Sequence, residues 1–257
     1  VMLLWGLITV LRALGVRDDK LFVTGMMKYD TAGISDSVAG QDALAAAMGI
    51  ASGEKLLVAG GTGGGEEQIV LDAFAEVRRE HPGVRLAIVP RKPERFDEVA
   101  RLISACGFAM VRRSELPDGA TGKISPDAVI LGDTMGELRK FYALSYAVFV
   151  GRSLVPEGGS DMIEAAALAK PVAFGPHTFN FPQAESMVAA GCARRVADAG
   201  QLAGAWTDWL DKPDDAAKTG RDAQQFVRSQ MGATGRNVEL ICRILGRSPS
   251  LAPVAIA

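Results

Sequence analysis

GRSLVPEGGSDMIEAAALAKPVAFGPHTFNFP, residues 151–182, is the stretch that decides the fold. It follows a short apolar run at Ala147–Val150 that predicts a buried strand, and its glycine pair at 158–159 frees the backbone for close approach to a ligand. Asp161 is placed to cap a helix, and a second short strand is expected to end at Phe174. A strand, a glycine-rich turn, a helix and a strand in this order form the unit that binds phosphorylated ligands outside the carboxyl ends of a parallel sheet.

The same alternation runs along the whole chain, where short apolar runs alternate with longer segments of helical period. The runs predict strands at Leu21–Thr24, Lys55–Ala59, Arg85–Val89, Ala109–Arg112, Ala128–Leu131, Ala147–Val150, Pro171–Phe174 and Ala193–Val196. The segments between and after them predict helices at Gln41–Met48, Glu66–Glu80, Arg95–Ala105, Met135–Leu144, Asp161–Leu168, Pro182–Ala190, Ala199–Leu210, Ala216–Gln230 and Arg236–Leu245. This pattern is typical of βαβ units, so the predicted fold is α/β with a doubly wound parallel sheet.

The composition of the 257 residues, 48% hydrophobic and 23% charged, is that of a globular protein of one or two domains. The net charge of -2 gives no indication of a nucleic-acid partner bound through bulk positive charge. Cys106, Cys192 and Cys242 lie far apart and show no C-x-x-C spacing, which favours reduced, packed thiols over a disulfide framework or a zinc site. The two histidines, His81 and His177, leave little material for a metal centre, so no metal is expected.

The two ends of the chain differ from the alternating part. Val1–Leu11 is strongly apolar but much shorter than the roughly 20 residues that span a bilayer, so we expect a buried piece of helix there. The first residue is Val rather than Met, which indicates a fragment or a processed product. Ser248–Ala257 is rich in proline and alanine and is expected to fray.

Polar residues follow several predicted strands at the edge where a ligand would bind. Thr134 and Glu137, three residues apart, predict a capping box that would leave the amides of Met135 and Gly136 free to attract phosphate. Glu137 can be explained by capping alone, by ligand contact, or by both. Arg91 follows the strand RLAIV and offers a planar fork suited to phosphate, although a solvated basic turn also explains it.

Three further candidates carry two interpretations each. Glu164 lies one turn into its predicted helix, where a carboxylate can accept hydrogen bonds from ribose hydroxyls or merely complement the helix dipole. The loop Gly60–Gly65 follows the strand KLLVA and is typical of a phosphate cradle, but no Walker lysine follows it. His177 and Asn180 can bind a ligand or simply form a turn.

Four strings of sequence together resemble the carboxyl-terminal half of the Kdo transferases, which move deoxy-octulosonic acid (Kdo) from CMP onto lipid A precursors. The strings are FVTGMMKYD (22–30), PRKPERF (90–96), GDTMGELRKFYA (132–143) and SLVPEGGSDMIEAAALAKPVAFGPHTFNF (153–181). The resemblance spans roughly residues 11–246. It implies a Rossmann-like donor-binding domain of the two-domain GT-B type.

The resemblance also implies roles for particular residues. Lys28, alternatively a snorkelling surface lysine, would stabilise the charge that develops on departing CMP. The implied nucleotide-binding residues are Pro90, Arg91, Met135, Gly136, Glu137, Asp161, Met162, Ile163 and Glu164. Transfer would need no metal or other cofactor.

The resemblance divides the chain into a linker helix (1–20), a nucleotide-sugar-binding domain (21–215), carboxyl-terminal helices (216–246) and a tail (247–257). In the family an amino-terminal domain carries the acceptor site, the carboxylate base and a membrane anchor at the cytoplasmic face of the inner membrane. The resemblance begins after that domain, so we expect this chain to be a fragment without it that is soluble and inactive by itself.

Several positions depart from the family pattern. Gly61, Gly63 and Gly64 stand where the family usually has Ser, His and Glu. The other departures are Met26 for Asn, Lys92 for His, and Ser160-Asp161 for a His-Asn pair. Because these positions cluster on the donor side, a non-catalytic CMP-binding module is an alternative, and an epimerase-like relative on the same fold is another.

Overall fold

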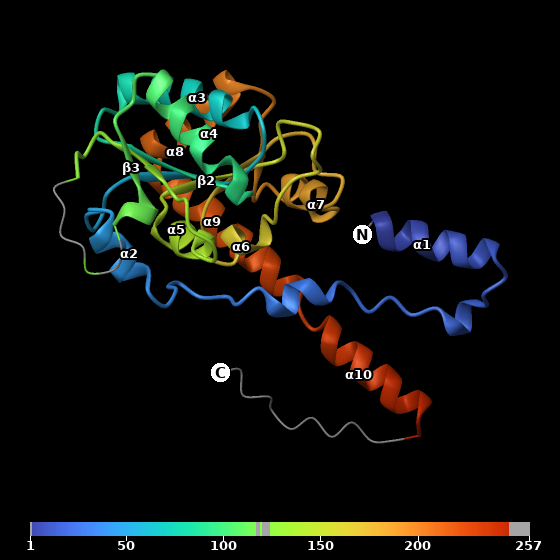
Figure 1. Cartoon of the computed structure of the whole chain (residues 1–257). Coiled ribbons are helices and arrows are strands. Elements are labelled where there is room, and N and C mark those ends of the chain that lie inside the picture. The colour runs from blue at the N-terminus through green and yellow to red at the C-terminus, as the bar shows by residue number, and fades with distance from the viewer. Residues whose placement is uncertain (1, 117–118, 120–123, 247–257) are drawn as a thin grey trace.

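A seven-stranded parallel sheet forms the centre of the structure, a computed structural model that describes residues 2–116, 119 and 124–246 (Figure 1). The strand order is β3-β4-β2-β1-β5-β6-β7. The strands are β1 (Leu56–Thr62), β2 (Arg85–Pro90), β3 (Met110–Arg112), β4 (Val129–Leu131), β5 (Ala147–Val150), β6 (Val172–Phe174) and β7 (Arg194–Arg195). The predicted doubly wound parallel sheet is confirmed.

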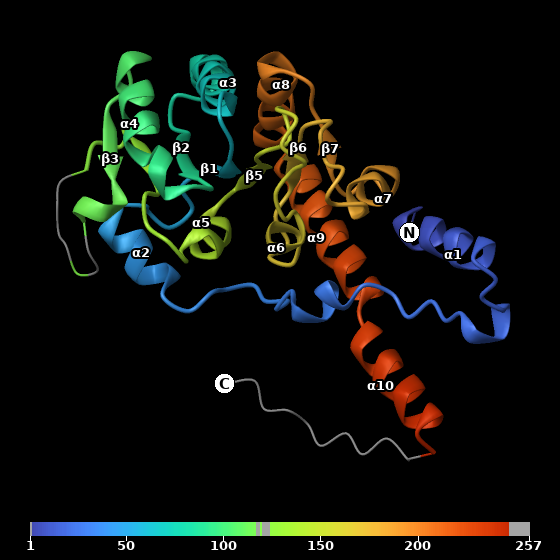
Figure 2. The same cartoon turned by 45° about the vertical axis from the view of Figure 1, so that its right-hand side comes forward.

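Helices cover both faces of this sheet (Figure 2). One face carries α3 (Glu66–Glu80), α4 (Phe96–Ala105) and α8 (Ala199–Asp211). The other carries α2 (Gln41–Ala47), α5 (Leu138–Leu144), α6 (Ile163–Ala166), α7 (Gln183–Ala189) and α9 (Pro213–Gln230). Along β1, Leu56 and Val58 therefore join one core cluster while Leu57 and Ala59 join the other. Burial of such a leucine or valine contributes about 1.5–3 kcal/mol, which explains why the strands are apolar on both faces.

The strand order reverses between β1 and β5. β1 pairs with β2 on one side and with β5 on the other, so that Leu57 lies opposite both Leu86 and Ala147. After these strands the chain leaves to opposite faces, from β1 into α3 and from β5 toward α6. In open α/β sheets ligands bind outside the carboxyl ends of the strands at such a point.

The predicted strand at Leu21–Thr24 is wrong. The segment is irregular, and the side chains of Phe22 and Val23 are more than half exposed. A run of apolar and β-branched residues needs a neighbouring strand to become part of a sheet, and here none lies beside it among the described residues. The chain first enters the core at the short turn Met27–Thr31, where Tyr29 is buried.

The amino-terminal segment does form a helix, α1 (Met2–Ala13), but none of the side chains whose exposure is described, from Ile8 to Leu11, is buried as expected. In Figures 1 and 2 this helix stands apart from the sheet domain, and Val10 and Leu14 are 54% and 75% exposed. Within the described residues, no helix has the length and apolar character needed to cross a membrane.

Two predicted helices near the site are shorter than expected. α5 begins at Leu138 rather than at residue 135, because Gly136 has a left-handed φ of 84° that a helix cannot contain. α6 spans only Ile163–Ala166, since Ala169 also lies in the left-handed region, with φ 55°. The residues directly before α5 therefore belong to a turn.

The last helix, α10 (Ala233–Ile244), is tied to the segment that enters the domain. Asp30 accepts hydrogen bonds from the amides of Gly232 and Thr234, at 2.5 and 2.6 Å, and Arg236 donates to the carbonyl of Thr24 at 2.7 Å. Apart from these contacts α10 extends away from the sheet domain (Figure 2). The expected frayed tail, 247–257, lies outside the described residues.

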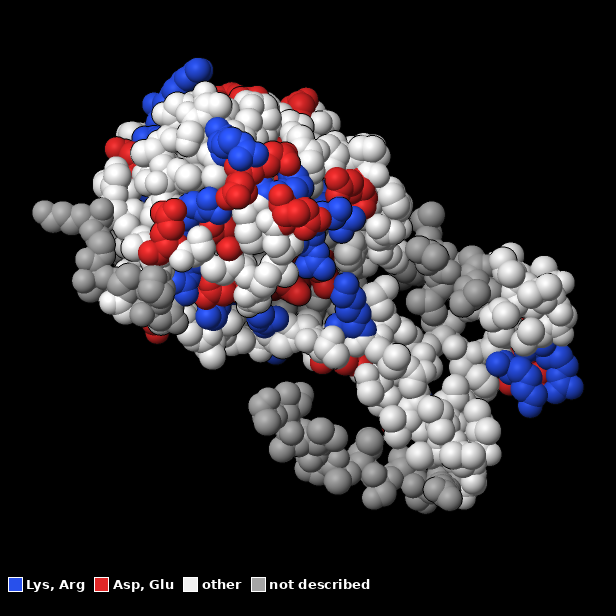
Figure 3. All heavy atoms as spheres, viewed as in Figure 1, with Lys and Arg blue, Asp and Glu red and all other residues white. Residues whose placement is uncertain are grey.

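Charged side chains are mixed on the face shown in Figure 3. Acidic and basic residues alternate over the sheet domain there, in keeping with the net charge of -2. This face therefore carries no extended patch of one sign.

Candidate functional site

A cleft with two adjoining lobes lies at the carboxyl ends of β1, β2 and β5. The lobes share four lining residues, Gly61, Arg91, Leu138 and Glu164. The β2 lobe, of about 240 Å³, is completed mainly by Pro90, Thr134, Met135, Gly136 and Arg139. The β5 lobe, of about 300 Å³, is completed mainly by Lys28, Arg152, Ser160, Asp161 and Phe181. The cleft lies at the reversal of strand order, where the fold predicts a ligand.

Arg91 and Glu164 form the wall that the two lobes share. Arg91 follows β2 directly, and neither its guanidinium nor the Glu164 carboxylate makes a hydrogen bond or ion pair with the residues that the structure describes. Burial raises the pKa of Glu164, the nearby Asp161 raises it further, and Arg139, Lys28 and Arg91 partly offset both effects. A charged donor and a charged acceptor without protein partners suit a ligand that carries both an anionic group and hydroxyls.

The turn after β4 forms one end of the β2 lobe, but the predicted capping box is wrong. Glu137 lines neither lobe, and its carboxylate accepts from Arg113 at 2.9 Å, from Lys140 at 3.1 Å and from the Thr134 hydroxyl. Burial alone would raise the pKa of Glu137, but these hydrogen bonds outweigh it and lower the pKa to about 2. Glu137 thus holds the turn in place, while Met135, 64% exposed, lies at the rim.

An ion pair closes one side of the β5 lobe. Lys28 Nζ lies 2.9 Å from Asp161 Oδ2 and 4.9 Å from the centre of the Phe181 ring. The other carboxylate oxygen of Asp161 accepts from the amide of Ile163 at 3.0 Å, so Asp161 supports the first turn of α6 although the N-cap position itself is Met162. Lys28 does reach the cleft, but Asp161 balances its charge.

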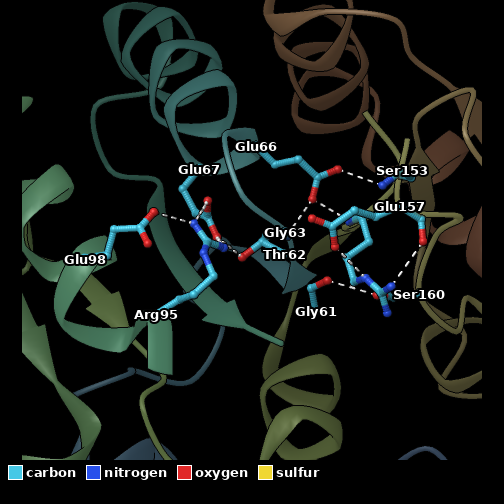
Figure 4. A network of polar contacts seen from close by, with 11 residues as sticks. Gly61, Thr62, Gly63, Glu66, Glu67, Arg95, Glu98, Ser153, Glu157 and Ser160 are labelled. Atoms are coloured by element: carbon cyan, nitrogen blue, oxygen red, sulfur yellow. Dashed lines mark hydrogen bonds and ion pairs between the residues drawn. The ribbon is translucent and has the colours of Figure 1, made fainter. Parts of the chain in front are cut away.

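In the predicted phosphate cradle at Gly60–Gly65, a carboxylate of the chain itself accepts a hydrogen bond from the loop. Glu66, fully buried at the start of α3, accepts hydrogen bonds from the amides of Gly63 (2.8 Å), Ser153 (2.7 Å), Leu154 (2.7 Å) and Arg152 (Figure 4). These backbone donors are of the kind that bind phosphate in other glycine-rich loops. Here an internal carboxylate accepts from the Gly63 amide of the loop and from three amides that follow β5, whereas Gly61 lines both lobes of the cleft.

Glu67 points to the opposite side of the same loop (Figure 4). Its carboxylate accepts from Thr62 Oγ1 at 2.7 Å and from both terminal nitrogens of Arg95 at 2.7 and 2.9 Å. The hydrogen bonds that Arg95 donates to Glu67 and Glu98 raise the pKa of Arg95 despite its partial burial. The two adjacent carboxylates thereby join β1 to both of its neighbours in the fold.

The glycine pair at 158–159 makes close contacts within the chain, although Gly159 also lines the β5 lobe. A Cβ at Gly158 would lie 2.0 Å from Asn180 Nδ2, and the Asn180 amide donates to the Gly158 carbonyl at 3.3 Å. The His177 amide donates to the Ser153 carbonyl at 2.9 Å. Neither His177 nor Asn180 lines the cleft, so the contacts support their interpretation as turn residues.

Two departures from the family pattern fit one another in space. A Cβ at Gly61 would lie 2.8 Å from Ser160 Oγ, which donates to the Gly61 carbonyl at 2.9 Å. A Cβ at Gly63 would lie 3.0 Å from Glu157 Oε2 and 3.1 Å from Arg152 Cγ. The glycines therefore make room for side chains of the β5–α6 loop.

Seven of the predicted site residues lie in the cleft and three do not. Those that line it are Lys28, Pro90, Arg91, Met135, Gly136, Asp161 and Glu164. Glu137, Met162 and Ile163 line neither lobe; Met162 and Ile163 are buried in the core, and Lys92 is exposed outside the cleft. The sequence prediction missed Arg139 and Arg152, although Arg152 follows so soon after a predicted strand that its position was a usable signal.

Comparison with known proteins identifies relatives for most of the chain, although no family model matches it. A 3-deoxy-D-manno-octulosonic acid transferase of Haemophilus influenzae is 34% identical over 239 residues, 91% of this chain and 54% of the relative. The enzyme of the same name from Bordetella pertussis is 34% identical over 87% of this chain and 52% of the relative. The chain thus spans about half the length of these curated relatives.

Comparison with solved structures gives the same family as the curated relatives. The C-terminal CMP-Kdo binding domain of WaaA from Acinetobacter baumannii superposes with a TM-score of 0.65 at 30% identity, covering 72% of this chain and 94% of that domain. WaaG, a glycosyltransferase involved in lipopolysaccharide biosynthesis, has a TM-score of 0.54 at 12% identity, which shows the shared GT-B fold alone. The chain therefore belongs to the Kdo transferase family, whose carboxyl-terminal domain it matches.

Proposed function

We propose that this chain forms the donor-binding half of a transferase that moves Kdo from CMP-Kdo to a lipid A precursor in lipopolysaccharide biosynthesis. The observation that carries the proposal is the shared wall of the cleft. Arg91 and Glu164 lie there without a partner among the residues that the structure describes, in a domain that matches a CMP-Kdo binding domain. A nucleoside monophosphate joined to a sugar acid carries the anionic groups and hydroxyls that such a wall would recognise.

Each lobe would then hold one part of the donor. Arg91 binds the phosphate, and Glu164 accepts hydrogen bonds from the ribose hydroxyls. Cytidine occupies the β2 lobe against Pro90, Met135 and Gly136. The sugar acid occupies the β5 lobe, where Lys28 faces the charge that develops on CMP as its bond to the sugar breaks.

The reaction also needs an acceptor site, which we propose is provided by a second domain. A carboxylate on that domain takes the proton from an acceptor hydroxyl, whose oxygen attacks the anomeric carbon while CMP leaves. Because lipid A precursors are membrane lipids, the assembled enzyme would act at the cytoplasmic face of the inner membrane.

A non-catalytic CMP-binding module is a second candidate, favoured by one contact. Asp161 forms an ion pair of 2.9 Å with Lys28, the residue proposed to stabilise the leaving group, and so offsets its charge. The epimerase-like alternative is supported by the shared fold alone. Fusing the chain to the amino-terminal domain of a family member separates the first two candidates, because only a transferase half should then release Kdo product in a radiolabelled assay.

The binding proposal is tested with two adjacent cations. Arg91→Ala should weaken CMP binding by about 1.5–3 kcal/mol, the range for a hydrogen bond to a charged group. Lys92→Ala is the matched control, since Lys92 is exposed and lines neither lobe, and it should leave the affinity unchanged. Titration calorimetry that detects no CMP binding, or equal losses in the two variants, would overturn the proposal.

A further inference from the structure

Arg152 is a charged residue of the cleft that the proposed function has not used. It follows β5 by two positions, and it lines the β5 lobe together with Lys28 and Arg91. Its side chain is 29% exposed. Arg152 is therefore placed to meet a ligand in that lobe.

The backbone of Arg152 is held in an unfavourable conformation. Its φ of 58° lies in the left-handed region, which costs a residue with a Cβ about 1–2 kcal/mol. Hydrogen bonds secure the peptide on both sides, since the Arg152 amide donates to Glu66 and its carbonyl accepts from the Gly159 amide at 2.7 Å. Backbone strain of this kind is concentrated at ligand sites, where the surrounding structure maintains it.

Glu157 orients the guanidinium of Arg152 but accepts hydrogen bonds from only some of its N–H groups. Nε donates to Glu157 Oε2 at 2.9 Å, and Nη2 donates to the Glu157 carbonyl at 3.1 Å. Both bonds use one edge of the planar group. The edge formed by Nη1 and the second N–H of Nη2 has no partner among the described residues, and two parallel donors are the geometry that binds a carboxylate.

The loop opposite is shaped around this arrangement. Gly63 has no side chain, and a Cβ there would press on Arg152 Cγ at 3.1 Å and on Glu157 Oε2 at 3.0 Å. The glycine at this position, where the family usually has a polar residue, thus makes room for the Arg152–Glu157 pair.

The chemistry of the donor indicates which group Arg152 meets, and this step rests on the proposed function. In a sugar acid of this class the carboxylate and the phosphate-bearing oxygen are attached to the same carbon. If Arg91 holds the phosphate, the carboxylate lies within a few ångströms of it, in the adjoining lobe. Lys28 is already paired with Asp161, whereas Arg152 keeps an unused edge there. We propose that Arg152 binds the carboxylate of the donor sugar and so makes the site select acidic over neutral sugars.

The test compares two ligands that differ by the sugar acid. CMP lacks the carboxylate, while freshly prepared CMP-Kdo carries it. Arg152→Gly is the informative variant, because glycine adopts a φ of 58° without strain and the backbone is retained. By calorimetry it should bind CMP within about twofold of the unmodified chain but CMP-Kdo at least about tenfold more weakly.

Two further variants separate recognition from support of the loop. Arg152→Lys keeps the charge without the fork and should lose part of the CMP-Kdo affinity with no change for CMP. Glu157→Gln removes the ion pair but leaves Arg152, so the preference for CMP-Kdo over CMP should persist. Circular dichroism melting checks that each variant is folded.

The outcomes distinguish the inference from the proposed function. If Arg152→Gly weakens CMP and CMP-Kdo equally, or weakens neither, Arg152 does not recognise the carboxylate and the inference is overturned. If the unmodified chain binds neither ligand, the proposed function fails as well.

Discussion

Glu66 and Glu164 both follow strands at the carboxyl edge of the sheet, but their surroundings are opposite. Glu66 is fully buried and accepts hydrogen bonds from the amides of two loops. Glu164 is partly exposed, has no hydrogen-bond partner among the described residues, and has a pKa raised mainly by burial. The comparison teaches that the loop most similar to a phosphate cradle supports the fold, whereas the ligand site lies where charged groups lack protein partners.

The largest expected effect is on stability, at Glu66. Glu66→Ala should lower the free energy of unfolding by at least about 3 kcal/mol, because it leaves several buried amides unpaired. Glu164→Ala is the matched control and should change it by less than about 1 kcal/mol. Urea denaturation measures both, and acetate, which can enter the vacated space, should restore part of the Glu66→Ala loss. Equal losses in the two variants would break the comparison.

The next effect is on ligand binding, at Glu164. Glu164→Gln should weaken CMP binding about tenfold without lowering stability, because the ribose hydroxyls lose a charged acceptor. The pH dependence has a defined sign. Because burial and then Asp161 raise the pKa of Glu164, the carboxylate protonates early as the pH falls, and CMP affinity should fall through that raised pKa.

Stability should depend on this group in the opposite direction. A raised pKa means that the protonated form favours the fold, so the contribution of Glu164 is present at low pH and is lost as the pH rises through the raised pKa.

The pH dependence of CMP affinity is measured by titration calorimetry from neutral to acidic pH. It compares the unmodified chain with Glu164→Gln, which should lack the acidic loss of affinity. Superimposable pH profiles would show that Glu164 does not hold the ribose.

The smallest effect is expected at Asp161. This carboxylate repels an anionic ligand, but its ion pair with Lys28 already offsets much of the repulsion. Asp161→Asn should therefore tighten CMP binding only about two- to threefold, and more at low salt, because it frees Lys28. Titration at two salt concentrations measures this. Weaker binding by the variant would show instead that Asp161 positions Lys28 for the ligand.

The positions of Arg91 and Glu164 were predictable because they depend on local features. Arg91 directly follows a short apolar run, Glu164 lies in the helix that follows the glycine-rich turn after another, and parallel strands bring their carboxyl ends to one edge of the sheet. The strands β1, β2 and β5 were predicted for the same reason, since both faces of the sheet are covered and the runs are apolar throughout. The resemblance of the four strings to a family added the expected ligand.

The predictions that proved wrong concern residues whose structure depends on partners distant in sequence. Leu21–Thr24 has the composition of a strand but no strand beside it in the described structure, and Glu137 has the spacing of a capping box but faces Arg113 from another loop. Arg152 follows a predicted strand closely, but its left-handed backbone is held by Glu66, 86 residues away, and that contact is not visible in the sequence.

By itself the sequence determined the α/β class, the edge of the sheet at which the site lies and the family, because hydrophobic periodicity and motif strings are local properties. Only the tertiary structure decided which polar groups are free. The Gly63 amide of the glycine-rich loop is satisfied by Glu66 and the charge of Lys28 by Asp161, whereas Arg91 and Glu164 keep unused hydrogen-bonding capacity within the described part of the chain. That difference arises because hydrogen bonds and ion pairs form between residues distant in sequence, and burial makes an unsatisfied group costly unless a ligand completes it.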